Sequence, residues 1–189
     1  MRKQLTWICL GLLLAATLAG CGHKYVSARV DRGADLAGIG YVAILPFENM
    51  TNFPEAGKIV PDLLATELYI SRAYRVMERT EAVAAAADQG IRVEDPIDAE
   101  TARRLGEKLG VDGVIFGSVS EYWYRVYREE DEEVEPAVGF SARLVSVATG
   151  EVVWSASVTR SSYDLLFSRR DPLNRVAQLA VIEMVRTLL

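Results

Sequence analysis

Two short apolar runs constrain the fold of this chain more than any other feature of its sequence. The first covers residues 41–47 and contains Pro46 near its end, and the second covers residues 111–116. A continuous apolar run of this length is typical of a strand that is buried on both faces. Because such a sheet needs helices over it, we expect an α/β fold.

The remaining segments extend this pattern into a full order of elements. Apolar residues at helical spacing predict four helices, at residues 62–72, 81–89, 98–109 and 171–188. Short apolar or alternating runs predict the strands, at residues 41–47, 74–78, 111–124, 138–144 and 152–159. The order β-α-β-α-α-β-β-β-α predicts a three-layer-type α/β sandwich with a mixed sheet.

Capping residues place the helix ends. The first helix begins either near Glu55 or at Pro61, since proline is favoured in the first turn. Thr80 and Asp98 are N-cap candidates for the next two helices, and Asp171 with Pro172 opens the last one.

The pattern also predicts which side chains are buried where helices cover the sheet. The candidates combine a strand or helix position with a large aliphatic side chain. They are Leu45, Leu64, Val76, Leu105, Ile115 and Val181.

The N-terminus has the layout of a secretory signal. Arg2 and Lys3 precede an apolar segment over residues 5–17, and the sequence Leu-Ala-Gly-Cys ends at Cys21. This resembles the lipobox of bacterial lipoproteins, which implies cleavage before Cys21 and a lipid on its thiol. The alternative, an uncleaved anchor with an accidental cysteine, fits less well, because the run is shorter than the roughly 20 residues that span a bilayer.

This interpretation divides the chain into a signal peptide at residues 1–20, a flexible tether at 21–38 and one α/β domain at 39–189. Cys9 leaves with the signal, so the mature protein has no free thiol and no disulfide. Gly22 stands where an aspartate often marks inner-membrane retention, so the resemblance implies export to the outer membrane.

The composition and the motifs of the chain argue against nucleic-acid binding, zinc binding and catalysis. The net charge of −5 argues against nucleic-acid binding through phosphate neutralisation. One histidine and two cysteines are too few for common zinc sites. His23 has no fixed acid or serine neighbour, and the chain contains no phosphate-binding or hydrolase motif. We therefore predict no catalytic residue, no cofactor and no metal.

Aromatic and basic residues follow one another in the strand after the second apolar run. This composition is typical of interaction surfaces and of membrane interfaces, although ordinary packing on a sheet face explains it equally well. The candidate surface consists of Tyr122, Trp123, Tyr124, Arg125 and Tyr127. The acidic run at 129–135 is interpreted as a solvated hairpin tip, with docking of a basic partner as the alternative.

Several segments together resemble one family of envelope proteins. They are residues 42–49, 62–68, 74–79, 102–106, 109–119 and 149–155. In this order they resemble the CsgG-like lipoproteins, a group related to LpoB and to the N-terminal domain of TolB. The likeness covers about residues 40–160 and is more specific for fold than for function.

The resemblance implies a non-enzymatic lipoprotein on the periplasmic face of the outer membrane. Its partner is an envelope protein or a second copy, in the manner of LpoB-like activators or assembly factors. The alternative is a CsgG-like subunit of an oligomeric secretion channel for curli-type fibres. Only one candidate membrane hairpin, residues 118–128 with 138–147, is present, and its arginines interrupt both faces.

Overall fold

The two apolar runs lie side by side at the centre of one mixed sheet. The computed structural model describes residues 24–30, 36–92, 96–127, 133–162 and 171–189. β2 (Tyr41–Ile44) pairs in parallel with the start of β5 (Gly113–Tyr127). Asp112 fixes this junction, because its Oδ2 accepts hydrogen bonds from the backbone N–H groups of Gly40 and Tyr41 at 3.0 and 2.8 Å.

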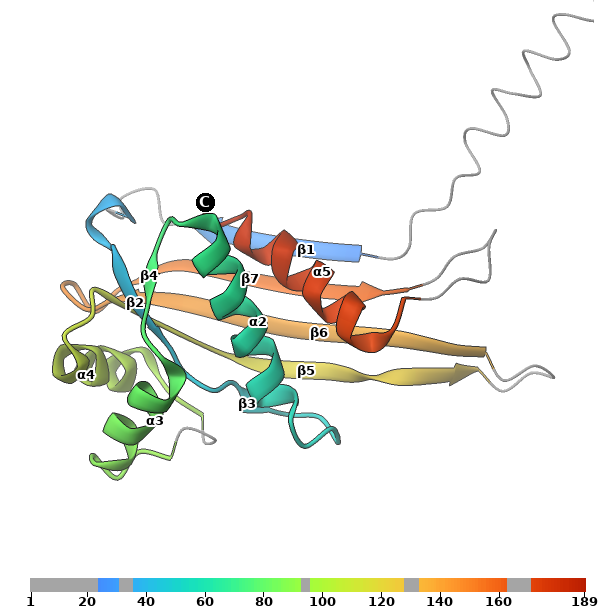
Figure 1. The fold of residues 1–189 in the computed structure, drawn as a ribbon, viewed down its shortest axis with the longest axis horizontal. Helices are drawn as coiled ribbons and strands as arrows, with labels where there is room; N and C mark the ends of the chain where they lie inside the picture. Colours follow the sequence, from blue (N-terminus) through green and yellow to red (C-terminus); the bar gives the residue numbers. More distant parts are fainter. Residues whose placement is uncertain (1–23, 31–35, 93–95, 128–132, 163–170) are drawn as a thin grey trace, which may run out of the picture.

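The sheet has the order β1-β7-β6-β5-β2-β4, and β3 pairs with β5 (Figure 1). β2 lies parallel to β4 and to β5, whereas β5, β6, β7 and β1 alternate in direction. The remaining strands are β1 (Lys24–Val30), β3 (Glu48–Asn49), β4 (Arg75–Val76), β6 (Glu133–Ser146) and β7 (Val152–Ser161).

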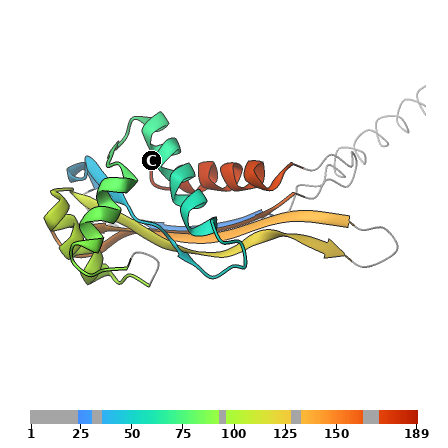
Figure 2. The ribbon, with the colours of Figure 1, turned by 60° about the horizontal axis from the view of Figure 1, so that its bottom comes forward.

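Helices cover the two faces of this sheet unequally. α2 (Ala56–Ser71) and α5 (Leu173–Val185) pack on one face and share a large apolar core with it. α3 (Arg79–Ala87) and α4 (Ala99–Leu109) form a second core on the opposite face. Figure 2 shows that α3 and α4 gather at one end of the sheet, so the molecule has three layers only there. A short 3-10 helix, η1 (Leu36–Gly38), precedes β2.

The predicted fold class and most of the predicted core are confirmed. The sheet is mixed, with helices on both faces, and the predicted elements follow one another in the predicted order, with β1, η1 and β3 in addition. Val76 is half-buried, whereas the other five predicted core residues are buried: Leu45, Leu64, Leu105, Ile115 and Val181.

The expected tether contains a strand, which corrects the sequence interpretation. Lys24–Val30 forms β1 and pairs antiparallel with β7 along its whole length. Val26 packs against the large core, while its neighbours along the strand are exposed. The proposed signal peptide and Cys21 lie outside the described residues.

Pro61 lies inside α2 and does not begin it. The helix starts at Ala56, so proline leaves the carbonyl of Gly57 without its usual i+4 donor. The N–H of Phe47 donates to that carbonyl at 2.8 Å. The missing helical bond thereby becomes a contact between α2 and the segment after β2.

Two other helix ends differ from the prediction by one or two residues. α3 starts at Arg79 with Glu78 in the cap position, so Thr80 is already helical. α5 starts at Leu173 with Pro172 in the cap position, so Asp171 lies one residue outside. Asp98 caps α4 as predicted, and its side chain accepts a hydrogen bond from the N–H of Thr101 at 2.7 Å.

Candidate protein-interaction surface

The outer half of β5 forms an open edge of the sheet. β3 pairs with β5 only at Ser118 and Val119, and a bulge follows between Val119 and Glu121. Beyond this point, among the described residues, β5 pairs with β6 alone. An edge of this kind presents backbone donors and acceptors that can pair with another chain.

Tyr122 belongs to the core and not to the predicted surface. The bulge places both Val119 and Tyr122 against the core under α2 and α5. Tyr122 is 1% exposed, and its hydroxyl donates to Oδ1 of Asn174 on α5 at 3.0 Å. Burial raises the pKa of this phenol above its ordinary value, so it acts as a neutral structural donor.

Trp123 and Tyr124 are exposed, at 51% and 48%, on opposite faces of β5. The Tyr124 hydroxyl lies 3.5 Å from the backbone N–H of Leu173, which donates to it, and this places Tyr124 on the side of α5. Trp123 points to the other face. Arg125 and Tyr127 belong to β5, but their side chains lie outside the described set, and their part in the surface stays a prediction.

The loop after β3 supplies surface residues that the sequence analysis missed. Asn49 holds this loop: its Nδ2 donates to the carbonyl of Phe53 at 2.7 Å, and its Oδ1 accepts from the backbone N–H of Thr51 at 3.0 Å. The fixed loop presents Met50 and Phe53 to solvent. The ring of Phe53 lies 5.0 Å from that of Tyr122.

An apolar groove separates this loop from the open edge of β5. Its volume is about 450 Å³. It is lined by Met50, Thr51, Asn52, Phe53, Ser120, Glu121, Tyr122, Trp123, Tyr124 and Leu173. We call it the Phe53 groove. Glu121 is the one charged side chain among these residues, so the lining is suited to apolar contact and not to acid–base chemistry.

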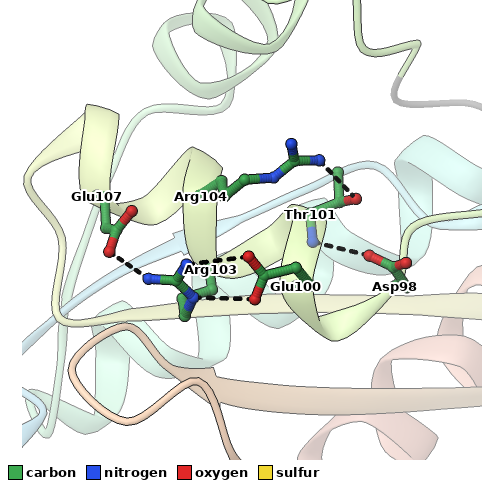
Figure 3. Close-up of polar contacts among 6 residues, drawn as sticks. All are labelled: Asp98, Glu100, Thr101, Arg103, Arg104 and Glu107. Carbon is green, nitrogen blue, oxygen red and sulfur yellow. Dashed lines mark hydrogen bonds and ion pairs between the residues drawn. The ribbon is translucent and has the colours of Figure 1, made fainter.

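The charged cluster on α4 is a second candidate, and it is explained by helix stability. Arg103 contacts Glu100 at 2.9 Å and also pairs with Glu107, and Asp98 caps the helix (Figure 3). The hydrogen bond from Arg103 holds the pKa of Glu100 below its ordinary value. Every carboxylate of this cluster thus has a partner within α4.

Within the described part of the chain, no group of three or more histidine, cysteine or acidic residues is placed to hold a metal ion. A search of the same residues for a helix long and apolar enough to cross a membrane also found none.

Solved structures with a similar fold come from bacterial envelope proteins. The PelC dodecamer from Paraburkholderia phytofirmans has 23% identity and a TM-score of 0.63, over 88% of this chain and 97% of that one. Lipoprotein GNA1162 from Neisseria meningitidis has 19% identity and a TM-score of 0.56, over 78% and 99%. The NMR structure of Escherichia coli LpoB has 16% identity and a TM-score of 0.50, over 65% and 58%.

No significant match was found among curated proteins. The family model described as "Curli production assembly/transport component CsgG" matches residues 34–168, well over half of the sequence. The match covers nearly all of the sheet as well as α2, α3 and α4. The chain therefore belongs to the CsgG family.

Proposed function

We propose that this CsgG-family protein is a lipoprotein, anchored through Cys21 in the outer membrane and facing the periplasm, that acts through protein contacts in envelope assembly. The observation that carries the proposal is the Phe53 groove, an apolar groove beside an open strand edge. No step of the proposed function requires catalysis.

The geometry favours a partner that adds an extended segment to β5. Backbone groups of such a segment pair with the strand edge, and its apolar side chains enter the groove between Phe53 and Tyr124. Loop 49–54 is held by the hydrogen bonds of Asn49, so little ordering entropy is lost when the groove is occupied.

The partner is either another envelope protein or a second copy of this chain. The structural likeness to a PelC dodecamer supports self-association, because that protein assembles from many copies. The description of the matching family supports the alternative role, a subunit of an oligomeric secretion channel for curli-type fibres. Both roles place the Phe53 groove at a protein–protein contact.

Site-specific photo-crosslinking in intact envelopes tests the proposal. A photoreactive phenylalanine analogue replaces Phe53 or Tyr124, and Tyr69, which is exposed on α2, is the matched control. We expect one defined product from both groove positions, identified by mass spectrometry as an envelope protein or as a second copy. Equal crosslinking from Tyr69, or none from the groove, contradicts the proposal.

The anchor is tested separately. Cys21→Ala removes the thiol that carries the lipid, so we expect loss of lipid labelling and a soluble or unprocessed protein. Fractionation of the envelope and mass spectrometry of the N-terminal peptide measure both effects. A cleaved Cys21→Ala protein that stays in the membrane fraction contradicts the lipoprotein assignment.

A further inference from the structure

We propose that the end of the sheet where β1 begins rests on the phospholipid surface, with Tyr25 and Trp123 at the interface. The inference rests on the proposed lipidation of Cys21. It adds the orientation of the domain, which the proposed function leaves open.

The chain between the anchor and the fold is very short. Cys21 is three residues before Lys24, where β1 starts, and three residues reach at most about 11 Å. Lipidation holds Cys21 at the bilayer surface. The start of β1 therefore lies within about 11 Å of that surface, even with the linking residues fully extended.

The strand register shows which residues of the neighbouring strands lie level with the start of β1. Lys24 pairs with Arg160, Arg160 with Val138, and Val138 with Tyr122. β5 continues for five more residues to Tyr127, which is about 17 Å beyond that level. In a domain whose strands stood perpendicular to the bilayer, this end of β5 would pass the level of Cys21, so the strands lie tilted on the surface, with the sheet face that carries Tyr25 and Trp123 turned toward it.

The opposite end of the domain is held away from the bilayer. The nine residues of β6 from Val138 to Ser146 span about 27 Å. α3 and α4 lie at that far end, whereas the start of β1, loop 49–54 and the start of α5 lie at the hairpin end (Figure 1). A domain that contacts the bilayer at the hairpin end therefore holds α3 and α4 away from the surface.

The anchor end also carries an unusual share of exposed apolar side chains. Half of the exposed large hydrophobic residues of the described chain lie there. They are Tyr25, Met50, Phe53, Trp123 and Tyr124.

These five residues lie on two surfaces that meet at Trp123, which also contributes to the lining of the Phe53 groove. Met50, Phe53 and Tyr124 border the Phe53 groove. Tyr25 pairs with Thr159, Thr159 with Gly139, and Gly139 with Glu121. Trp123 is two residues beyond Glu121, so Tyr25 and Trp123 share the sheet face opposite α5. Tryptophan and tyrosine are the side chains enriched at membrane–water interfaces.

Tryptophan fluorescence provides a direct test. The chain has three tryptophans, and Trp7 leaves with the signal peptide. The mature protein then contains Trp123, which is exposed, and Trp154, which is buried under α5. The mature lipoprotein is inserted into phosphatidylcholine vesicles whose acyl chains carry bromine, a quencher that acts only at short range.

We expect brominated vesicles to remove most of the Trp123 emission and little of the Trp154 emission. Trp123→Phe is the control that isolates Trp154. A second variant combines Trp123→Phe with Lys108→Trp, which places the probe on α4 at the far end, and we expect no quenching there. Melting temperatures of all variants confirm that each one is folded.

The outcomes separate the orientation from the anchor. Protein that floats with vesicles and carries the lipid on Cys21, but shows no quenching of Trp123, overturns the orientation and leaves the proposed function intact. A blue shift of Trp123 without quenching indicates burial by a second copy and also overturns it. Quenching at position 108 has the same consequence. Protein that neither floats nor carries the lipid defeats both proposals.

Discussion

At the scale of single residues, Tyr122 shows how one side chain joins the hairpin to the helical layer. Its ring packs in the core, and its hydroxyl donates to Asn174 on α5. Tyr124, two residues later, has only a long contact of 3.5 Å with the N–H of Leu173. The two hydroxyl groups therefore have different energetic weights.

We expect Tyr122→Phe to lower the free energy of unfolding by about 1 kcal/mol, the usual contribution of one hydrogen bond. Tyr124→Phe is the matched control, and we expect it to leave stability nearly unchanged. Urea unfolding followed by circular dichroism measures both. Equal effects of the two substitutions show that the bond to Asn174 does not stabilise the fold.

The cap of α4 makes a contribution to the stability of the folded state that depends on pH. The N–H of Thr101 donates to the ionised Asp98 side chain and lowers the pKa of this carboxyl below its ordinary value. A lowered pKa in the folded state means that the contribution is complete above the ordinary aspartate pKa. It is lost as the pH falls through the folded-state value.

Asp98→Asn separates the cap from its charge, because asparagine also caps helices but does not titrate. We expect the melting temperature of the wild type to fall more steeply with acidification than that of Asp98→Asn. Asp98→Ala lacks the cap and melts lower at every pH. If the melting temperatures of the wild type and of Asp98→Asn fall by the same amount as the pH is lowered, the charge of Asp98 does not have this role.

At the scale of elements, Gly57 and Pro61 allow α2 to pack closely against the segment after β2. Pro61 frees the Gly57 carbonyl for the N–H of Phe47. Gly57 also approaches the carbonyl of Phe47 closely: a Cβ on Gly57 would stand 2.4 Å from that oxygen. The absence of a side chain at Gly57 is what allows the helix to lie so near.

We expect Gly57→Ala to cost about 1–3 kcal/mol, as overpacking of a tight contact does. Gly40→Ala is the control, because a Cβ there would meet Asp112 at an ordinary 3.7 Å. Denaturant unfolding of the two variants measures the difference. A Gly57→Ala protein as stable as Gly40→Ala contradicts the close approach.

β1 provides another prediction at this scale. A variant that begins at residue 36 lacks β1 and the packing of Val26 on the core, whereas one that begins at residue 24 keeps both. We expect the shorter variant to be less stable by at least about 1 kcal/mol, a value suited to one half-buried valine. If the two variants unfold at the same urea concentration, residues 24–30 do not stabilise the domain and act as a tether.

The sequence predicted the elements that have long, regular apolar patterns and missed those that lack them. α4 was predicted with its cap, because Asp98 and Gly110 are local signals that need no tertiary contact. β1 was missed because Val26 alone packs on the core, so the alternation along the strand is weak. Pro61 was misplaced because its compensating donor, Phe47, comes from outside the helix.

The candidate surface was predicted only in part, for a related reason. The bulge between Val119 and Glu121 shifts the alternation of β5, so Tyr122 is buried while Trp123 and Tyr124 are exposed. Met50 and Phe53 carry no local signal for a surface. Their position depends on the hydrogen bonds of Asn49 and on pairing of β3 with β5, which are tertiary features.

At the scale of the whole molecule, the sheet has two unlike ends. One end combines the start of β1, loop 49–54 and the hairpin ends of β5 and β6, and the other carries α3 and α4 (Figure 1). Loop 49–54 borders the Phe53 groove, so the groove belongs to the first end. The proposed anchor at Cys21 acts on the first end. Under the proposed lipidation, a partner that binds the groove meets the domain close to the membrane, and the α3–α4 end is free for contacts farther from it.

This polarity allows the two candidate roles to be separated in living cells. An assembly factor keeps the hairpin on the periplasmic side of the outer membrane, whereas a channel subunit carries the acidic run across it. A basic side chain on the lipid face at the midplane of a barrel costs about 2–4 kcal/mol and an acidic one costs less. Residues 129–135 contain six acidic side chains whose costs add up, so this run crosses only where the assembly provides an aqueous path.

Single cysteines report on this difference, because under the proposed cleavage and lipidation the mature chain has no other free thiol. We expect Glu130→Cys to resist a thiol reagent that cannot pass the outer membrane and to react once that membrane is permeabilised. Lys108→Cys, exposed on α4 at the far end, is the periplasmic control and should behave in the same way. Labelling of Glu130→Cys in intact cells, with Lys108→Cys protected, establishes the channel role in place of the assembly role.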